Sequence, residues 1–386
     1  MTRSFDRRRP WRRADPRRTD LPEVSQLVWR RNLVIFVLLS ALTALPGARA
    51  SGGTVVRVSV HSPALQGNML GDSPDRPVSI YLPPGYRQHP ERRYPVLYLL
   101  HGFGASDAMW FGRGYAKDVH LPEIADRVFA GGQAQPMIIV MPDADSRYGG
   151  SFYVDSSVGG DWGTFITRDL VRYVDAHYRT LARPESRAIA GHSMGGYGAM
   201  VLAMTHPDIY RVVYAMSAPY LDLRRPQSIA ALSPGDFLPT LKGLASGRLP
   251  SSGEGDVNLA TAAAFSPDPG NPPSYVDLPY RLEGGKAVSV PQVWRRWQSH
   301  APLAMLGKDA GNLRAFRGVG LDVGAHDPRA DFVSGAKAFD AALTRAEVSH
   351  VFQVYDGKHA DRLATRLATV VLPFLSRHLA GAGATG

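Results

Sequence analysis

The sequence predicts an α/β protein with a mostly parallel central sheet and helices on both of its faces. Short apolar segments typical of buried strands alternate with longer segments whose apolar residues recur at helical spacing. Such alternation is typical of β-α-β units, whose strands pair in parallel. A Gly-His-Ser-Met-Gly stretch also lies between a predicted strand and a predicted helix. The pattern breaks over residues 219–318, which predicts a long insertion.

The first part of the domain supplies four predicted strands and two predicted helices. The strand segments alternate in polarity or are continuously apolar. Residues 94–100 form a continuous apolar run, as expected of a strand that is buried on both faces. We predict strands at residues 54–60, 78–82, 94–100 and 137–142, and helices at residues 117–129 and 161–178. Asp161 is expected to cap the second helix.

The Gly-His-Ser-Met-Gly stretch, residues 191–195, fits the pattern G-x-S-x-G at a sharp turn between strand and helix. The turn strains the serine backbone, so Gly191 and Gly195 are required where a side chain would collide. It exposes the Ser193 hydroxyl at the start of a helix, whose dipole favours developing negative charge. We therefore interpret Ser193 as a nucleophile rather than a chance serine in a glycine-rich turn.

The second part of the chain resumes the α/β pattern only after a long interruption. We predict strands at residues 212–216, 317–323 and 350–355, and helices at residues 331–343 and 362–379. The intervening residues 219–318 are rich in Pro, Gly and Ser, and we interpret them as a partly irregular cap beside the active site. Residues 293–297 are its most aromatic piece, and they either line a substrate cleft or pack inside the cap.

The first 50 residues have the pattern of an export leader. Residues 3–31 are rich in Arg and Pro, which predicts disorder. Residues 33–45 are apolar but too short for a comfortable transmembrane helix, and Ala48-Arg49-Ala50 resembles a cleavage site. We predict a signal peptide at residues 1–50 and a hydrolase-like domain at residues 51–386. An uncleaved N-terminal anchor is the alternative.

Most of the positive charge of the chain lies in this leader. Residues 1–50 contain 11 Arg and 4 acidic residues, which leaves +3 of the net charge of +10 for the remainder. We therefore expect no nucleic-acid partner. The chain contains no Cys, which excludes disulfides, a Cys nucleophile and thiolate metal ligands. No metal and no organic cofactor is implied.

A serine nucleophile needs a base within hydrogen-bond reach and an acid that orients the base. His359 lies in a Gly-containing loop after the last predicted strand, and Asp327 lies in the turn after the strand before it. The order Ser, Asp, His is the order of the α/β-hydrolases. We predict that Ser193, Asp327 and His359 form a catalytic triad. Asp331 and then Asp322 are the next candidates for the acid.

The oxyanion hole of such a site needs two preorganised backbone N–H groups. We expect one from Met194, directly after the nucleophile, and the other from Phe103 in the His-Gly-Phe-Gly loop after the strand at residues 94–100. The glycines of that loop allow close approach of the backbone to the reacting oxygen. The candidate substrate contacts around these groups are Gly102, His101, Trp162 and His192.

Several short motifs together resemble the Putative esterase family of α/β-hydrolases. This family includes esterase D (S-formylglutathione hydrolase), bacterial feruloyl and acetyl-xylan esterases, and the antigen 85 mycolyltransferases. The motifs are residues 100–104, 151–153, 161–165, 191–196 and 357–359. The turn Gly324-Ala325-His326-Asp327 is similar to the Gly-x-x-Asp turn that carries the acid in this family. The resemblance covers roughly residues 78–379 apart from the cap, and it implies the fold and the triad but no particular substrate.

The expected function is that of a secreted or cell-envelope serine carboxylester hydrolase that forms an acyl-enzyme. Its substrate would be an ester of a small molecule, a glycolipid or a polysaccharide, and no stable membrane insertion is expected after signal cleavage. One alternative is an acyltransferase similar to antigen 85, which passes the acyl group to a sugar or lipid hydroxyl. The elbow residue before the serine and the long cap differ from antigen 85. A second alternative is a non-catalytic cell-envelope binding protein on a hydrolase fold.

Overall fold

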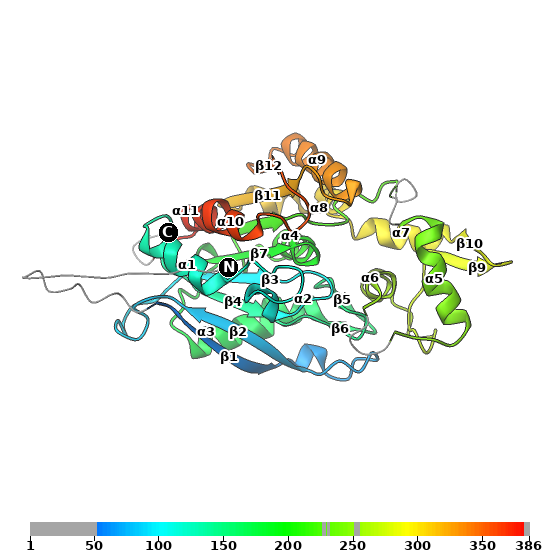
Figure 1. Ribbon diagram of the computed structural model, residues 1–386, viewed down its shortest axis with the longest axis horizontal. Coiled ribbons are helices and arrows are strands. Elements are labelled where there is room, and N and C mark those ends of the chain that lie inside the picture. Colours follow the sequence, from blue (N-terminus) through cyan, green and yellow to red (C-terminus); the bar gives the residue numbers. More distant parts are fainter. Residues whose placement is uncertain (1–51, 226–228, 230–231, 251–254, 382–386) are drawn as a thin grey trace, which may run out of the picture. The chain divides into compact units, whose positions relative to one another are not determined.

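An eight-stranded sheet forms the centre of the computed structural model, which describes residues 52–225, 229, 232–250 and 255–381. The strands are β1 (Thr54–His61), β2 (Asp75–Leu82), β3 (Val96–Leu100), β4 (Ile138–Pro142), β7 (Arg187–His192), β8 (Val212–Met216), β11 (Gly318–Gly324) and β12 (Val351–Tyr355). Their order is β1-β2-β4-β3-β7-β8-β11-β12 (Figure 1). All neighbouring pairs from β4 to β12 are parallel, whereas β2 is antiparallel to both of its neighbours. The predicted mostly parallel sheet is therefore confirmed.

Helices cover both faces of this sheet. One face packs against α1 (Leu121–Ala130), α10 (Leu363–Arg366) and α11 (Leu372–His378). The other packs against α2 (Trp162–Thr164), α3 (Leu170–His177), α4 (Met194–Thr205), α8 (Pro302–Arg314) and α9 (Ala330–Arg345). Single π-helical turns join α2 to α3 at Phe165–Asp169 and α10 to α11 at Leu367–Val371. Short 3₁₀ turns lie at Pro63–Leu65, Asp107–Trp110 and Pro184–Ser186.

Strand β3 shows why its sequence is apolar throughout. All five residues are completely buried, and successive side chains point to opposite faces of the sheet. Leu97 and Leu99 belong to the core under α1, whereas Tyr98 and Leu100 belong to the core under α4. A strand with a core on each side has no position for a polar side chain.

The segment between β8 and β11 is more regular than the sequence suggests. It contains α5 (Pro234–Ala245), α6 (Val257–Phe265), the hairpin β9 (Tyr280–Glu283) and β10 (Lys286–Ser289), and α7 (Pro291–Ser299), before α8. Three prolines of this Pro-rich segment stand at the first position of α5, α7 and α8, where the missing N–H costs nothing. The hydroxyl of Ser233 also accepts a hydrogen bond from the Asp236 N–H and so caps α5.

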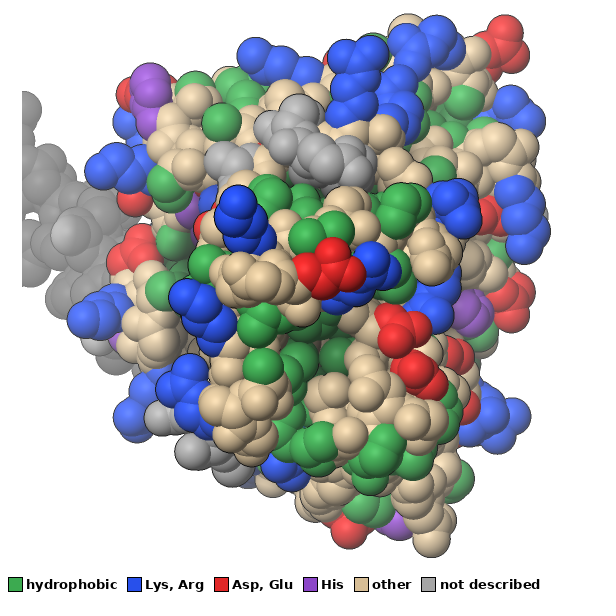
Figure 2. Space-filling view, turned by 90° about the vertical axis from the view of Figure 1, so that its right-hand side faces the viewer, with side chains coloured by type: hydrophobic (Ala, Val, Ile, Leu, Met, Phe, Trp, Pro, Cys, Tyr) green, Lys and Arg blue, Asp and Glu red, His purple; other side chains and the backbone are tan. Residues whose placement is uncertain are grey.

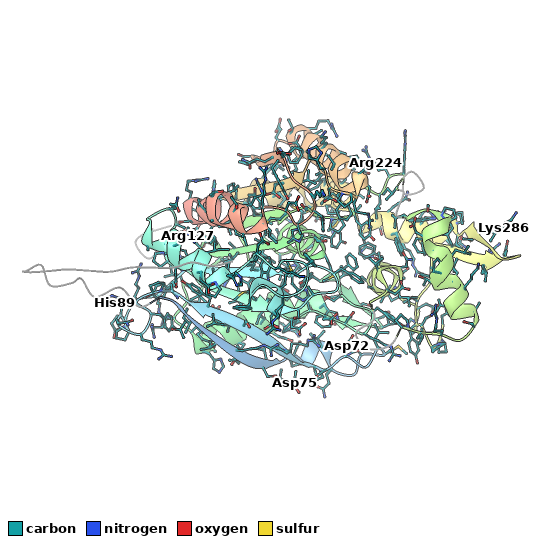
Figure 3. All side chains as sticks on the ribbon, viewed as in Figure 1. Asp72, Asp75, His89, Arg127, Arg224 and Lys286 are labelled. Atoms are coloured by element: carbon teal, nitrogen blue, oxygen red, sulfur yellow. The ribbon has the colours of Figure 1, made fainter. Side chains whose placement is uncertain are left out.

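Aromatic packing holds this cap together. Trp294 and Trp297 are buried and lie against Phe237, and the Trp297 indole donates a 2.8 Å hydrogen bond to Ser266. Of the two roles expected for residues 293–297, these tryptophans therefore have the packing role. Lys286 lies at the outer end of the hairpin (Figure 3). The end of the domain formed by the cap shows acidic and basic side chains interspersed with hydrophobic ones (Figure 2).

The structure tests the expected capping role of Asp161 but not the predicted signal peptide. Asp161 does stand at the N-cap position of α2, but its side chain makes no capping hydrogen bond; it belongs instead to the short ribbon β5 (Asp155–Ser156) and β6 (Gly160–Asp161). The predicted signal peptide, residues 1–50, lies outside the described residues. Among the residues that are described, no helix combines the length and apolarity that a membrane span requires.

Candidate active site

Ser193 occupies a strained turn between β7 and α4. Its backbone angles are φ 56° and ψ −121°, a conformation that residues with a side chain rarely adopt. A Cβ at Gly195 would collide with the carbonyl of Leu100, and one at Gly191 would collide with the backbone of Gly195. The Ser193 N–H donates a 2.9 Å hydrogen bond to the carbonyl of Met216 at the end of β8. Contacts with the neighbouring backbone thus hold Ser193 in a conformation that its own φ/ψ preference does not favour.

Asp327 and His359 are joined by a short hydrogen bond. The His359 Nδ1 lies 2.7 Å from the Asp327 Oδ2, and the Asp327 side chain is completely buried. The other carboxylate oxygen of Asp327 accepts a 2.9 Å hydrogen bond from the Arg329 N–H. The His359 ring also packs against Phe332, with the ring centres 5.3 Å apart. These contacts fix the orientation of the imidazole.

The two loops that carry these residues are hydrogen-bonded to each other. The N–H groups of Ala325 and His326 donate to the carbonyls of Tyr355 and Gly357, at 2.8 and 2.9 Å. A Cβ at Gly324 would collide with the carbonyl of Gly357. The glycine of the Gly-x-x-Asp turn is therefore needed for close approach of the backbones.

The alternative acids have other partners. Asp322 is buried within β11, where it accepts hydrogen bonds from the Tyr214 hydroxyl, at 3.0 Å, and from Arg366, at 2.7 Å. Asp331 lies in the first turn of α9 but does not cap it, because Arg329 holds the N-cap position and directs its guanidinium to Asp331 at 3.3 Å.

His101 orients the loop that was predicted to supply one oxyanion N–H. Its Nε2 accepts a 2.8 Å hydrogen bond from the Ala144 N–H, so its Nδ1 carries the proton and donates to the Gly102 carbonyl, also at 2.8 Å. Burial lowers the pKa of His101, which keeps the ring neutral in this role. Because a trans peptide is planar, fixing the Gly102 carbonyl also fixes the opposite direction for the Phe103 N–H.

Met194 supplies the first N–H of α4, and the first N–H groups of a helix have no partner within the helix. A Cβ at Gly102 would lie 3.2 Å from the Cβ of Ser193, which places the loop of Phe103 beside Ser193. Both predicted oxyanion donors thus lie on backbone that borders Ser193.

Ser193 and His359 line one pocket of about 320 Å³. Most of its other lining side chains are apolar or aromatic: Phe103, Tyr115, Phe152, Met194, Pro219, Tyr220, Val257 and Phe332, with Arg329 as the cation. Val257 comes from α6, so the cap contributes to the wall. Apolar surroundings of this kind strengthen the hydrogen bonds made inside the pocket.

None of the four predicted substrate contacts is among the residues that line this pocket. His101 is completely buried and bonded on both ring nitrogens. Trp162 is buried under Arg76, and its indole donates to the Gly159 carbonyl. His192 is also buried, and its two ring nitrogens face the Tyr115 hydroxyl and the His359 carbonyl. Gly102 alone stays beside the nucleophile, and its contact with substrate stays a prediction.

The sequence analysis missed the aromatic wall of the pocket. Phe152 and Tyr220 both have positive φ angles, of 51° and 55°, in irregular segments where no periodicity shows which way a side chain points. The motif at residues 151–153 was noticed only as part of the family resemblance. Phe332 lies at the start of α9, where its ring packs against His359.

Comparison with known proteins identifies the family. The family model described as Putative esterase matches residues 72–363, most of the chain. An esterase of Mycobacterium tuberculosis is 36% identical over 150 residues, which are 38% of this chain and 30% of that protein. An endo-1,4-beta-xylanase/feruloyl esterase of Xylanibacter ruminicola is 30% identical over 138 residues, 34% of this chain and 18% of that protein. The chain therefore spans less than a third of the length of these curated relatives.

Solved structures extend the likeness over the whole domain. A ferulic acid esterase matches with a TM-score of 0.58 and 25% identity, covering 84% of this chain and 98% of that one. An S-formylglutathione hydrolase from Agrobacterium tumefaciens matches with a TM-score of 0.52 and 17% identity, covering 85% and 96%. The chain has the α/β-hydrolase fold and belongs to the Putative esterase family.

Proposed function

We propose that this protein is a serine carboxylester hydrolase whose triad is Ser193, His359 and Asp327. The observation that carries the proposal is the 2.7 Å hydrogen bond from His359 to a fully buried Asp327, in a pocket that His359 shares with Ser193. Membership of the esterase family supports the reaction class.

Acylation begins when the His359 Nε2 takes the proton from the Ser193 hydroxyl as its oxygen attacks the ester carbonyl. Asp327 holds the Nδ1 proton and stabilises the imidazolium that forms. The N–H groups of Phe103 and Met194 donate to the oxyanion. When the tetrahedral intermediate collapses, the proton on Nε2 goes to the departing alcohol, and Ser193 keeps the acyl group.

Deacylation repeats the same steps with water as the nucleophile. His359 takes a proton from the water as it attacks the acyl-enzyme, and the same N–H groups hold the second oxyanion. Collapse returns the proton to the Ser193 oxygen and releases the carboxylic acid. None of these steps requires a cofactor.

The acyl group is aromatic or otherwise apolar. Phe103, Phe152, Tyr220 and Phe332 present ring surfaces inside a pocket of about 320 Å³, which suits a planar ring. The likeness to a ferulic acid esterase supports a hydroxycinnamoyl group. The alcohol is the sugar of a polysaccharide or glycolipid, or a small molecule.

Export belongs to the same proposal. The basic segment, the apolar run at residues 33–45 and the site at Ala48-Arg49-Ala50 support cleavage before Ser51. N-terminal sequencing of exported protein tests this step. Material that keeps residues 33–45 in the membrane fraction would contradict it.

Labelling by a fluorophosphonate, combined with a substitution of the nucleophile, tests the chemistry. Ser193→Ala should abolish labelling and lower turnover of p-nitrophenyl esters by ~10³-fold or more while the protein still folds. The matched control is Ser217→Ala, because Ser217 also has a positive φ at a strand end but is completely buried. Labelling or turnover that survives Ser193→Ala refutes the mechanism.

Substrate screening then tests the specificity. Methyl ferulate should be hydrolysed with a higher kcat/KM than methyl acetate, which has the same leaving group, if the aromatic wall binds the acyl group. Product analysis with a sugar acceptor separates hydrolysis from acyl transfer, because a transferase yields the sugar ester instead of the free acid.

A further inference from the structure

His192 is buried between two residues of the pocket and belongs to neither the triad nor the oxyanion hole. Its Nε2 lies 2.8 Å from the backbone carbonyl of His359, and its Nδ1 lies 3.2 Å from the Tyr115 hydroxyl. Its ring centre is 4.8 Å from that of His359 and 5.7 Å from that of Tyr115. His192 directly precedes Ser193, so it connects the turn of Ser193 to the loop that carries His359.

The direction of these hydrogen bonds follows from their acceptors. A backbone carbonyl only accepts hydrogen bonds. The His192 Nε2 therefore carries a proton and donates a hydrogen bond to the His359 carbonyl. Burial, with a smaller effect of His359, lowers the pKa of His192 to about 3, so the ring is neutral and its Nδ1 is an acceptor. The Tyr115 hydroxyl therefore donates to His192.

Tyr115 extends this chain to the oxyanion loop. Its side chain is 39% exposed at the pocket, but its hydroxyl lies where a Cβ of Gly102 would stand. The Tyr115 hydroxyl is therefore in close contact with the Gly102 backbone. The hydrogen bonds run in one direction, from Tyr115 through His192 to the His359 carbonyl, and such chains strengthen one another.

We propose that Tyr115 and His192 form a positioning relay that holds the His359 backbone and the Gly102 loop in register with Ser193. This inference rests on the proposed function, since it takes His359 as the base and the Gly102 loop as the source of an oxyanion N–H. Neither residue touches the reacting atoms in this role. The relay couples the Gly102 loop, which follows β3, to the His359 loop, which follows β12; these two strands lie on opposite sides of β7 in the sheet.

His192 adds an anchor to the loop of His359, which the Asp327 loop also holds through Gly357 and the imidazole. The loop of His359 spans residues 356–362 between β12 and α10, and most of these residues are exposed or half-buried. Lys358 is held by a 3.2 Å hydrogen bond from its N–H to Asp361 and a 3.3 Å bond from the Tyr355 hydroxyl to its carbonyl. Both of these bonds lie within the loop and its own strand. The bond from His192 ties the backbone of His359 to the nucleophile elbow itself.

Two substitutions at one position separate positioning from packing. His192→Leu keeps an apolar group of similar size but removes the N–H donor, whereas His192→Gln places an amide N–H near the position of Nε2. With p-nitrophenyl butyrate, His192→Leu should lower kcat by up to ~10²-fold with little change in KM, because misplacing a reacting group by about 1 Å has that effect. His192→Gln should recover at least about tenfold of that loss.

Tyr115→Phe is the second variant, and it removes one hydroxyl from a partly exposed side chain. It should lower kcat by about tenfold, because it leaves the His192 Nδ1 buried without a donor. Combined with His192→Leu it should add little, since both substitutions interrupt one chain. His350→Leu is the matched control, because the His350 side chain is also buried and bonded to a backbone carbonyl but lies just before β12, at the opposite end of that strand from the His359 loop.

The outcomes distinguish this inference from the proposed function. Turnover within about threefold of the unsubstituted enzyme in either His192→Leu or Tyr115→Phe overturns the relay. Equal losses in His192→Leu and His192→Gln, at equal melting temperatures, overturn it as well, because a packing role would not depend on the N–H. If Ser193→Ala stays active, the proposed function fails instead.

Discussion

Asp327→Asn is the substitution whose effect the structure defines most closely. An asparagine has the shape of aspartate but presents one donor and one acceptor instead of two acceptors. At this position the Oδ1 side faces the Arg329 N–H at 2.9 Å, and the Oδ2 side faces the His359 Nδ1 at 2.7 Å. The Arg329 N–H is a fixed donor, so it requires the amide oxygen on its side. The amide NH₂ group is therefore turned toward His359.

An NH₂ group facing the His359 Nδ1 forces that nitrogen to act as an acceptor. The ring proton then resides on Nε2, which can no longer take the proton of Ser193. We expect kcat to fall by up to ~10⁴-fold, the scale known for the wrong imidazole tautomer in a serine triad. The hydrogen bond from Arg329 survives, so the melting temperature should change little.

Stopped assays with p-nitrophenyl butyrate, together with thermal melting, measure both effects. Asp331→Asn is the matched control, because Asp331 is a neighbouring carboxylate that contacts Arg329 but not His359. It should keep turnover within about threefold. If Asp327→Asn retains more than about a tenth of the turnover, the hydrogen bond to Asp327 is not what orients the base, and the reasoning is refuted.

Two further predictions concern stability. Asp322→Asn should lower the free energy of unfolding by about 3 kcal/mol in urea titrations, because it leaves Arg366 buried without its counter-charge. Turnover of the folded protein should be unchanged. An unaltered urea midpoint would contradict the predicted loss of stability. Burial, and to a smaller extent Arg296, lowers the pKa of His300 from 6.5 to about 4. Between pH 6.5 and pH 4, His300 therefore takes up a proton in the unfolded chain but not in the folded one. The free energy of unfolding falls as the pH drops through this range. Between pH 7 and pH 5, His300→Gln should lose less unfolding free energy than the unsubstituted protein, by on the order of 1 kcal/mol after solvent screening, and parallel losses would refute the assignment.

Local sequence was sufficient to predict the parts of the fold that depend on local chemistry. The continuous apolar run of β3 and the glycines around Ser193 leave few alternatives, because burial on both faces and a strained turn each demand one residue type. The contact between Asp327 and His359 followed from chain order, since consecutive parallel strands end at the same edge of a sheet. The catalytic roles of these residues stay predictions.

The rest depended on tertiary structure. Whether His101 and His192 face a pocket or a core depends on the neighbouring loops, and the sequence contains no periodicity that would show it. Proline favours both turns and the first turn of a helix, so the Pro-rich composition of residues 219–318 could not reveal that Pro234 begins α5. The aromatic wall is assembled from segments that are distant in sequence, so its composition could not be predicted from any one of them.

The position of β12 explains why the base needs more than one anchor. Order across the sheet is β7-β8-β11-β12, so β12 is an edge strand three spacings, or about 14 Å, from the strand that carries Ser193. The loop after β12 must therefore fold back over the ends of β11 and β8 before His359 can reach the nucleophile. Asp327 meets it from β11 and fixes the ring, and His192 meets it from β7 and fixes the backbone. The ring contact from the turn after β11 fixes the direction of the imidazole, and the backbone contact from β7 adds to the definition of its place.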